Sequence, residues 1–144
     1  MARRKPYKVR VPTVRSREDF APLMRGLRTM DPNAAHSVAR DLALSDLFFL
    51  GVYVLGRPDA DNDWVFDRCR EVQANPNGYL DLWAREHFKS SIITHWLTIQ
   101  DILADPEATF GIFSHTRPIA KQFLRQIKLD FERNEWLKAL FPDV

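Results

Sequence analysis

The sequence predicts an α/β fold in which a helical N-terminal region precedes a strand-helix-strand-helix unit with parallel strands. The first observation is a short aromatic and apolar segment, residues 79–84, which runs directly into a long amphipathic stretch. The second is a β-branched and aromatic segment, residues 109–114, which is followed by another helical pattern. Strands that alternate with helices in this way usually form parallel sheets with right-handed crossovers.

Residues 34–78 are expected to be the helical region. Apolar side chains recur there at near-helical spacing as far as residue 55, with Asn33 as a candidate N-cap and Gly56, followed by Pro58, as a stop. Residues 62–72 carry a second helical stripe, which ends in the turn-forming cluster of residues 75–78. We therefore expect two or three helices before the first strand.

Residues 79–144 contain the predicted strands and the helices that connect them. Asp105 and Pro106 should end the first of these helices, and Pro118 lies where proline is favoured, near the first turn of the second. The expected buried face of the first helix consists of Ile92, Trp96, Ile99 and Leu103. The expected buried face of the second consists of Ala120, Phe123, Ile127 and Phe131, before a short final segment around Leu137 and Leu140.

Residues 1–33 are predicted to be a basic, flexible arm. Four prolines divide this segment, and seven cations lie in its first half: Arg3, Arg4, Lys5, Lys8, Arg10, Arg15 and Arg17. A solubilising tail and an arm that touches nucleic acid or an acidic partner both fit this composition. The net charge of the whole chain is only +2, which argues against a generic polyanion binder.

The composition is that of one globular domain. The chain has 144 residues, of which 45% are hydrophobic and 28% charged, close to ordinary averages. The single cysteine, Cys69, is expected to be a small buried hydrophobe, and it fits a reducing, cytoplasmic setting. No apolar run approaches the roughly 20 residues that cross a bilayer, and the basic start is not followed by a signal-peptide core. Secretion and membrane insertion are therefore not expected.

Lys89 and Ser90 are the residues whose pattern indicates chemistry, because they open a helix directly after a predicted strand. A helix start offers unpaired backbone N–H donors and a partial positive charge. A lysine there can contact the outer phosphates of a nucleotide, and a serine hydroxyl can bind Mg²⁺. These are the parts of a Walker A loop. On spacing alone, an ordinary surface lysine and serine remain an alternative.

The two glycines of the standard Walker A pattern, GxxxxGKS or GxxxxGKT, are missing. Their positions hold Trp83 and Phe88. The glycine before the lysine usually permits a left-handed backbone, which costs another residue about 1–2 kcal/mol. We therefore expect the backbone of this loop to differ locally from the standard one.

Residues 79–144, and more loosely residues 45–78, resemble the ATPase core of the large terminase subunit of tailed bacteriophages; the ending Phe141, Pro142 and Asp143 is part of the resemblance. The resembling stretch reads DLWAREHFKSSIITHWLTIQDILADPEATFGIFSHTRPIAKQFLRQIK. That family commonly has a deviant Walker A, with an arginine four residues before the lysine and then KS or KT; here the arginine is Arg85. Residues 111–116 and 120–128 resemble the family's next strand, turn and helix. The resemblance implies a partial P-loop NTPase fold over residues 34–144.

The resemblance also implies ATP hydrolysis that drives DNA into a preformed capsid in the host cytoplasm. Lys89 would contact the β- and γ-phosphates, Ser90 would bind Mg²⁺, and Arg85 would be a catalytic arginine that stabilises charge on the transferred group. The other implied cofactor-binding residues, mainly through backbone N–H groups, are Glu86, His87, Phe88 and Ser91. Implied partners are double-stranded DNA, the portal protein, the small terminase subunit and further copies in a ring, with no membrane.

A Walker B strand, which ends in an aspartate and a glutamate, does not occur in these 144 residues, and the family's nuclease domain would lie beyond Val144. We therefore expect this chain to be an N-terminal ATPase fragment that binds nucleotide but does not turn it over quickly. One alternative is a non-catalytic interaction module or truncated remnant. Another is a P-loop ATPase of a different motor family, which would share Lys89 and Ser90.

Other candidate sites have weaker support. Asp59, Asp61 and Asp63 are spaced like the start of a calcium loop, but Trp64 and Arg70 occupy positions that need glycine and glutamate. The spacings of His87, His95 and His115 match no compact zinc pattern. Gln73 is a candidate for contact with adenine, with a surface glutamine as the alternative. The tryptophans follow helical or strand stripes, which favours core positions over a base-stacking platform.

Overall fold

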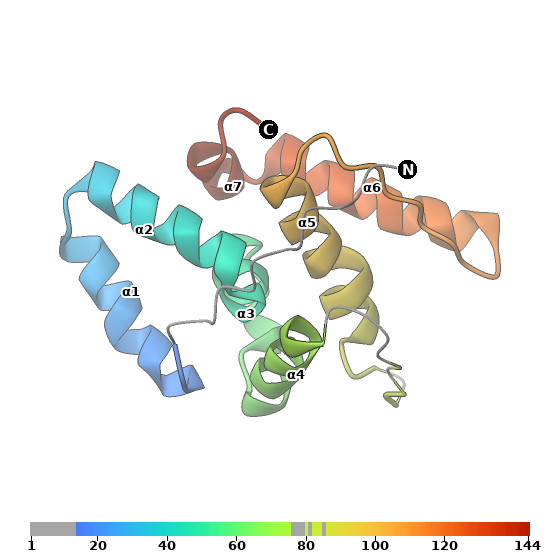
Figure 1. The fold of residues 1–144 in the computed structure, drawn as a ribbon, viewed down its shortest axis with the longest axis horizontal. Coiled ribbons are helices and arrows are strands. Elements are labelled where there is room, and N and C mark those ends of the chain that lie inside the picture. Colours follow the sequence, from blue (N-terminus) through green and yellow to red (C-terminus); the bar gives the residue numbers. More distant parts are fainter. Residues whose placement is uncertain (1–13, 76–79, 81, 85) are drawn as a thin grey trace.

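The computed structural model describes residues 14–75, 80, 82–84 and 86–144, and this part of the chain is helical. Helices account for 71% of it, and it contains no β-strand. The predicted α/β fold with a strand-helix-strand-helix unit, and with it the partial P-loop NTPase fold, is therefore wrong for the described residues. Figure 1 shows the described residues as an array of packed helices.

The first helices form an antiparallel pair at one side of the molecule (Figure 1). A short 3₁₀ turn, η1 (Arg17–Asp19), leads into α1 (Phe20–Thr29), and α2 (Pro32–Ser45) follows after a tight connection. Asp31 is the N-cap of α2, since its carboxylate accepts hydrogen bonds from the N–H groups of Asn33 (3.0 Å) and Ala34 (3.2 Å). The prediction that Asn33 is the cap is wrong by two residues.

A buried helical segment follows, formed by α3 (Leu47–Phe49) and the π-helical η2 (Leu50–Val54). It ends at Gly56, whose φ of 71° is the left-handed conformation that glycine adopts without strain, as the predicted stop requires. The 3₁₀ turn η3 (Pro58–Ala60) then leads to α4 (Asp63–Ala74), which Asn62 caps. The helical stripe predicted for residues 62–72 is confirmed.

The second half contains two long helices. The π-helical η4 (Ser90–Leu97) continues without a break into α5 (Thr98–Ala104), so that residues 90–104 form one helix. After an extended loop come α6 (Arg117–Arg133), with Pro118 in its first turn, and the short α7 (Glu135–Leu140). The predicted buried face of the first helix is confirmed, because Ile92, Trp96 and Ile99 are fully buried and Leu103 nearly so.

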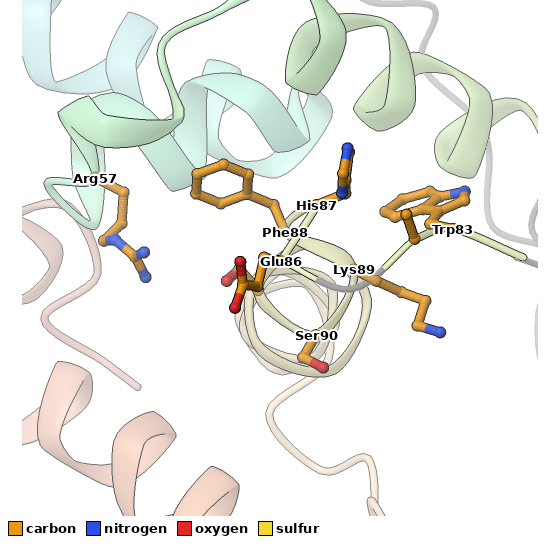
Figure 2. A pocket seen from close by; sticks show the side chains of 9 residues that line it. Arg57, Trp83, Glu86, His87, Phe88, Lys89 and Ser90 are labelled. Carbon is orange, nitrogen blue, oxygen red and sulfur yellow. The ribbon is translucent and has the colours of Figure 1, made fainter.

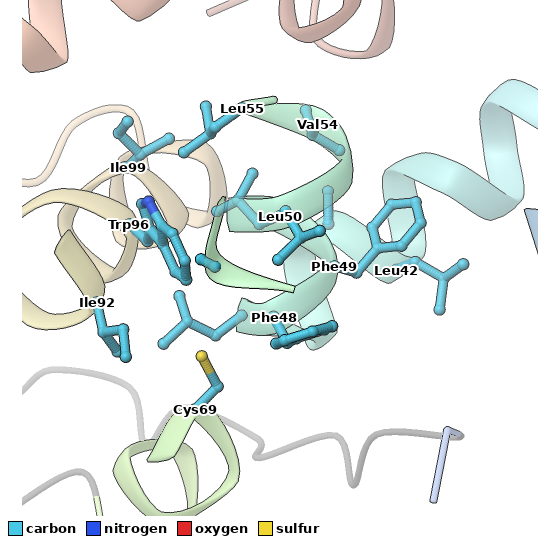
Figure 3. Packing of buried hydrophobic residues seen from close by; sticks show 14 of the residues in the cluster. Leu42, Phe48, Phe49, Leu50, Val54, Leu55, Cys69, Ile92, Trp96 and Ile99 are labelled. Atoms are coloured by element: carbon cyan, nitrogen blue, oxygen red, sulfur yellow. The ribbon is translucent and has the colours of Figure 1, made fainter. Parts of the chain in front are cut away.

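The hydrophobic core lies where α2, α3, η2, α4 and the helix of residues 90–104 meet (Figure 3). Trp96 packs directly on Gly51: a Cβ atom at Gly51 would lie 2.3 Å from the indole ring. Asp46 is fully buried and forms a bidentate ion pair with Arg70, with N–O distances of 2.8 and 3.0 Å. This pair ties the start of α3 to α4, and Asp46 also accepts the N–H of Phe49.

Phe20 of α1 also belongs to the core. Its ring is fully buried and lies 5.3 Å from the ring centroids of Phe48 and Tyr53. The described part of the predicted arm, residues 14–33, therefore contains a helix that packs on the core, while residues 1–13 lie outside the described residues. The domain boundary at residue 33 stays a prediction.

Neither segment predicted to be a strand, residues 79–84 or residues 109–114, has a neighbouring strand in the described part of the chain. A strand is held by hydrogen bonds to a neighbouring strand, and no such neighbour lies beside either segment within the described part of the chain. Residues 79 and 81 lie outside that part, while Leu80 and Leu82 are 76% and 82% exposed, unlike a buried strand. Residues 109–114 form neither helix nor strand, and Phe113 is 95% exposed. β-Propensity alone is therefore not enough to form a strand here.

Candidate functional site

The helix that contains η4 begins at Lys89 and Ser90, the two residues that the sequence pattern indicated. Lys89 has helical φ and ψ of −52° each, and the N–H of Ile92 donates to the carbonyl of Phe88 over 2.8 Å. The prediction that Lys89 and Ser90 open a helix is confirmed. Free backbone N–H groups and the positive end of the helix dipole are therefore present at this point.

The backbone before the helix is left-handed at two non-glycine residues, Glu86 (φ 64°) and Phe88 (φ 58°). The expectation that the loop avoids the conformation of the missing glycine is thus wrong at position 88. Phe88 takes the left-handed conformation itself, directly before the lysine. A left-handed residue followed by a right-handed one turns successive N–H groups toward a common point, which is the arrangement that binds anions in P-loops.

Aromatic packing explains how the loop holds this conformation, which costs about 1–2 kcal/mol at each non-glycine residue. Phe88 and Trp83 both pack against the hydrophobic core. Trp64 of α4 packs edge to face on Trp83 and on His87, with ring centroids 5.4 and 5.3 Å apart. Trp64 is 38% exposed, so the prediction that the tryptophans lie in the core holds for Trp96 but not for this one.

A cavity of about 450 Å³ adjoins this loop (Figure 2). Its volume lies within the range of roughly 300–1,000 Å³ that is usual for small-molecule sites. The lining residues are Arg57, Trp83, Ala84, Glu86, His87, Phe88, Lys89, Ser90 and Ser91. The cavity thus brings together every described residue that the sequence assigns to phosphate or Mg²⁺. Their roles stay predictions, and Arg85 lies outside the described residues.

Arg57 is the lining residue that the sequence analysis missed. It comes from the turn after η2, and Figure 2 shows Arg57 and Lys89 on opposite sides of the start of η4, with the Lys89 side chain pointing away from Arg57. Asp59 holds its guanidinium in a bidentate pair, with Nε–Oδ1 and Nη2–Oδ2 distances of 3.0 and 2.9 Å. The pair raises the pKa of Arg57 and lowers the pKa of Asp59. An arginine fixed in this way is a preorganised positive charge at the cavity wall.

Side chains on the wall differ in exposure and charge. Glu86, His87, Lys89 and Ser90 are exposed, whereas Phe88 and Ser91 are half-buried. Arg57 and Lys89 contribute two positive charges, against the negative charges of Glu86 on the wall and of Asp59, which pairs with Arg57. These four charges balance, so a negatively charged group would be attracted by Lys89 and the backbone N–H groups rather than by a net positive wall. The Ser90 hydroxyl is accessible to a metal ion that a ligand carries.

The alternative metal sites have structural partners instead. Asp61 and Asp63 both pair with Arg17, at 3.3 and 2.6 Å, so the acidic segment is a salt-bridged turn. His95 is buried and its Nε2 lies 2.5 Å from a carboxylate oxygen of Asp130. Within the part of the chain that the structure describes, no group of three His, Cys, Asp or Glu could hold a metal ion.

Gln73, the candidate for adenine contact, has both ends of its amide occupied. Its Oε1 accepts from the N–H of Leu47 (3.1 Å) and its Nε2 donates to the carbonyl of Ser45 (3.0 Å). These bonds satisfy backbone groups at the junction of α2 and α3. Gln73 is thus a structural residue that ties α4 to this junction.

A scan against protein-family models and searches of curated proteins and solved structures find no match to this chain. Among the described helices, none is both long and apolar enough to span a membrane.

Proposed function

We propose that residues 86–91 bind the phosphate groups of magnesium-ATP as a Walker A loop without glycine. The observation that carries this proposal is the left-handed Phe88, which lies directly before Lys89 and Ser90 at the start of a helix and beside a cavity. In this proposal the cavity holds the phosphates, and Phe88 takes the left-handed conformation at the position where the standard motif has glycine.

Each residue has a definite part in this proposal. The N–H groups around Phe88, Lys89 and Ser90 donate to phosphate oxygens, because a left-handed residue followed by a right-handed one forms an anion-binding concavity. The ammonium of Lys89 neutralises charge on the outer phosphates. Arg57 contributes a second cation on the side of Glu86, where its pairing with Asp59 fixes its position.

The donor set fits magnesium that arrives with the nucleotide. Mg²⁺ keeps several waters and is usually bound through substrate phosphates with one or two protein oxygens. Ser90 offers one such oxygen, at the place where a Walker A serine lies, and it is exposed on the cavity wall. The ion would partly neutralise the phosphates beside Glu86, which would otherwise repel them.

The resemblance to the large terminase subunit suggests the biological role of this nucleotide binding. The chain is then the N-terminal ATPase part of a phage DNA-packaging motor, and the full-length protein couples ATP hydrolysis to movement of double-stranded DNA into the capsid. The portal protein, the small terminase subunit and a ring of identical subunits are its partners in this proposal. Arg85 keeps the role of the catalytic arginine.

A second candidate function is a non-catalytic interaction module, and the fold favours it. P-loop ATPases place the phosphate loop between a strand and a helix, whereas the described residues form helices alone. In this alternative Lys89 is an incidental surface cation and the cavity holds no nucleotide.

Titration calorimetry with magnesium-ATP separates the two candidates. The proposal predicts binding by the native chain, a loss of at least tenfold in affinity in Lys89→Ala, and no change in Lys138→Ala. Lys138 is a suitable control because it is an exposed lysine of α7 that lies outside the cavity lining. Equal binding by the two variants, or no binding by the native chain, would rule out the phosphate loop and leave the interaction module.

A further inference from the structure

The outer face of α6 carries an unusual concentration of positive charge. Residues 108–129 contain four lysines and arginines and no aspartate or glutamate, although the whole chain has a net charge of only +2. The four cations are Arg117, Lys121, Arg125 and Lys128, and all are exposed. We call them the α6 basic stripe.

The geometry of α6 brings these cations into one row. At 3.6 residues per turn, their positions fall within an arc of about 80° around the helix axis, over a length of about 16 Å. Ile127, the buried residue of α6, lies about 120° around the helix axis from the middle of the stripe, between Phe123 and Phe131, which are half-buried. The stripe therefore faces away from the core. Figure 1 shows the N-terminal part of α6 extending beyond the neighbouring helices.

None of the four cations forms an ion pair within the described part of the chain, although the exposed Glu132 lies one turn beyond Lys128 on the same face of α6. Other arginines of this protein are paired there: Arg17 with Asp61 and Asp63, Arg57 with Asp59, and Arg70 with Asp46. By contrast, no ion pair is found for the four cations of the α6 basic stripe among the described residues. Four like charges in one row repel one another, so a polyanion that lies along α6 would relieve this repulsion.

We propose that the α6 basic stripe binds the phosphate backbone of a nucleic-acid duplex. One strand of a duplex carries a phosphate every 3.4 Å along the axis, and the strand also winds around that axis, so that a straight row of about 16 Å faces only some of the roughly five phosphates in this length. A straight helix with regularly spaced cations suits a stiff polymer with regularly spaced charges better than it suits an irregular acidic protein surface. The inference deepens the proposed function, since it gives the DNA a surface separate from the nucleotide loop.

Salt dependence of DNA binding tests the inference directly. Each neutralised phosphate contributes about 0.9 to the slope of log K against log salt. The double variant Lys121→Gln/Arg125→Gln should therefore reduce that slope by about two and weaken binding more than tenfold at low salt. The measurement is the fluorescence anisotropy of a short labelled duplex, titrated with the whole chain across a salt series.

A matched control removes two cations elsewhere. Arg25 and Arg28 of α1 are exposed, so Arg25→Gln/Arg28→Gln changes the net charge equally. Equal effects of the two double variants would overturn the inference and indicate attraction by net charge alone. Competition by poly-glutamate as strong as that by unlabelled duplex would also overturn it, in favour of an acidic protein partner.

This test of DNA binding can be separated from the test of the nucleotide site. Magnesium-ATP binding by Lys121→Gln/Arg125→Gln should equal that of the native chain, and circular dichroism should show that the variant is folded. Loss of DNA binding with ATP binding intact supports the α6 basic stripe. DNA binding that persists undiminished in this variant refutes it, whatever Lys89→Ala does to ATP binding.

Discussion

Glu86 allows the left-handed loop to be tested by a pair of substitutions. Its φ is 64° and its side chain is exposed, so a change there acts on the backbone conformation with little loss of packing. A left-handed conformation costs a non-glycine residue about 1–2 kcal/mol, whereas glycine loses about 0.5–1 kcal/mol more backbone entropy on folding. Glu86→Gly should therefore be more stable than Glu86→Ala by about 1 kcal/mol.

Urea unfolding measures this difference as a shift in midpoint at constant slope. Both variants remove the carboxylate, so the effect of charge cancels. The same pair of substitutions at Gln122, an exposed residue inside α6, is the control. There the sign should reverse, with alanine more stable than glycine by about 1 kcal/mol. A more stable alanine at position 86 as well would refute the left-handed loop.

Three further predictions concern the frame that supports the site. Gly51→Ala should lower the free energy of unfolding by about 1–3 kcal/mol, because its methyl group would collide with the ring of Trp96, and thermal unfolding will show this. Asp46→Ala should cost about 3–5 kcal/mol in urea unfolding, because it leaves Arg70 without its buried partner. Cys69 should resist iodoacetamide in the native chain, because burial raises the pKa of its thiol.

Each of these has a matched comparison. Gly26→Ala, in α1 and with open space around its Cβ position, should stabilise the protein, so an equal loss in both glycine variants would contradict the packing argument. Asp59→Ala removes a surface pair and should cost less than about 1 kcal/mol; a similar cost for Asp46→Ala would mean that its ion pair contributes little. Cys69 should react once urea unfolds the chain, and rapid reaction before unfolding would contradict its burial.

Helices could be predicted from the sequence because their signals are local. Gly56 ends its helix, the stripe of residues 62–72 lies in α4 and Pro118 lies in the first turn of α6, as expected. The buried face around Trp96 follows from helical periodicity alone. The prediction of an Asn33 cap failed because the helix begins earlier: Asp31 accepts the N–H groups of Asn33 and Ala34, and Pro32 and Asn33 are already in the helix.

The absence of the two expected strands could not be predicted from local sequence, because strand formation depends on residues far away in the sequence. The aromatic and β-branched composition of residues 109–114 shows only that the backbone tends to be extended. Whether such a segment becomes a strand depends on a neighbour that offers hydrogen bonds, and none lies beside it in the described part of the chain. The exposed Phe113 shows that an apolar side chain in such a segment need not be buried.

The candidate site was predicted in part. The sequence pattern of Lys89 and Ser90 correctly gave the start of the helix, but the absence of glycine led to a wrong expectation for Phe88. Packing of Phe88 and Trp83 against the core offsets the free-energy cost of the left-handed backbone at Phe88. Local backbone propensity alone disfavours this conformation. Arg57 could not be found, because only the folded chain brings its turn to the cavity.

Backbone amide shifts test the phosphate loop most directly. In a ¹⁵N-labelled sample titrated with tripolyphosphate and magnesium, the N–H signals of Phe88, Lys89 and Ser90 should move most, because these donors surround the proposed anion site. The same signals should not move in Lys89→Ala at matched concentrations. If only the amide signals near other lysines and arginines move, or if no amide signal moves, the proposed phosphate loop is wrong.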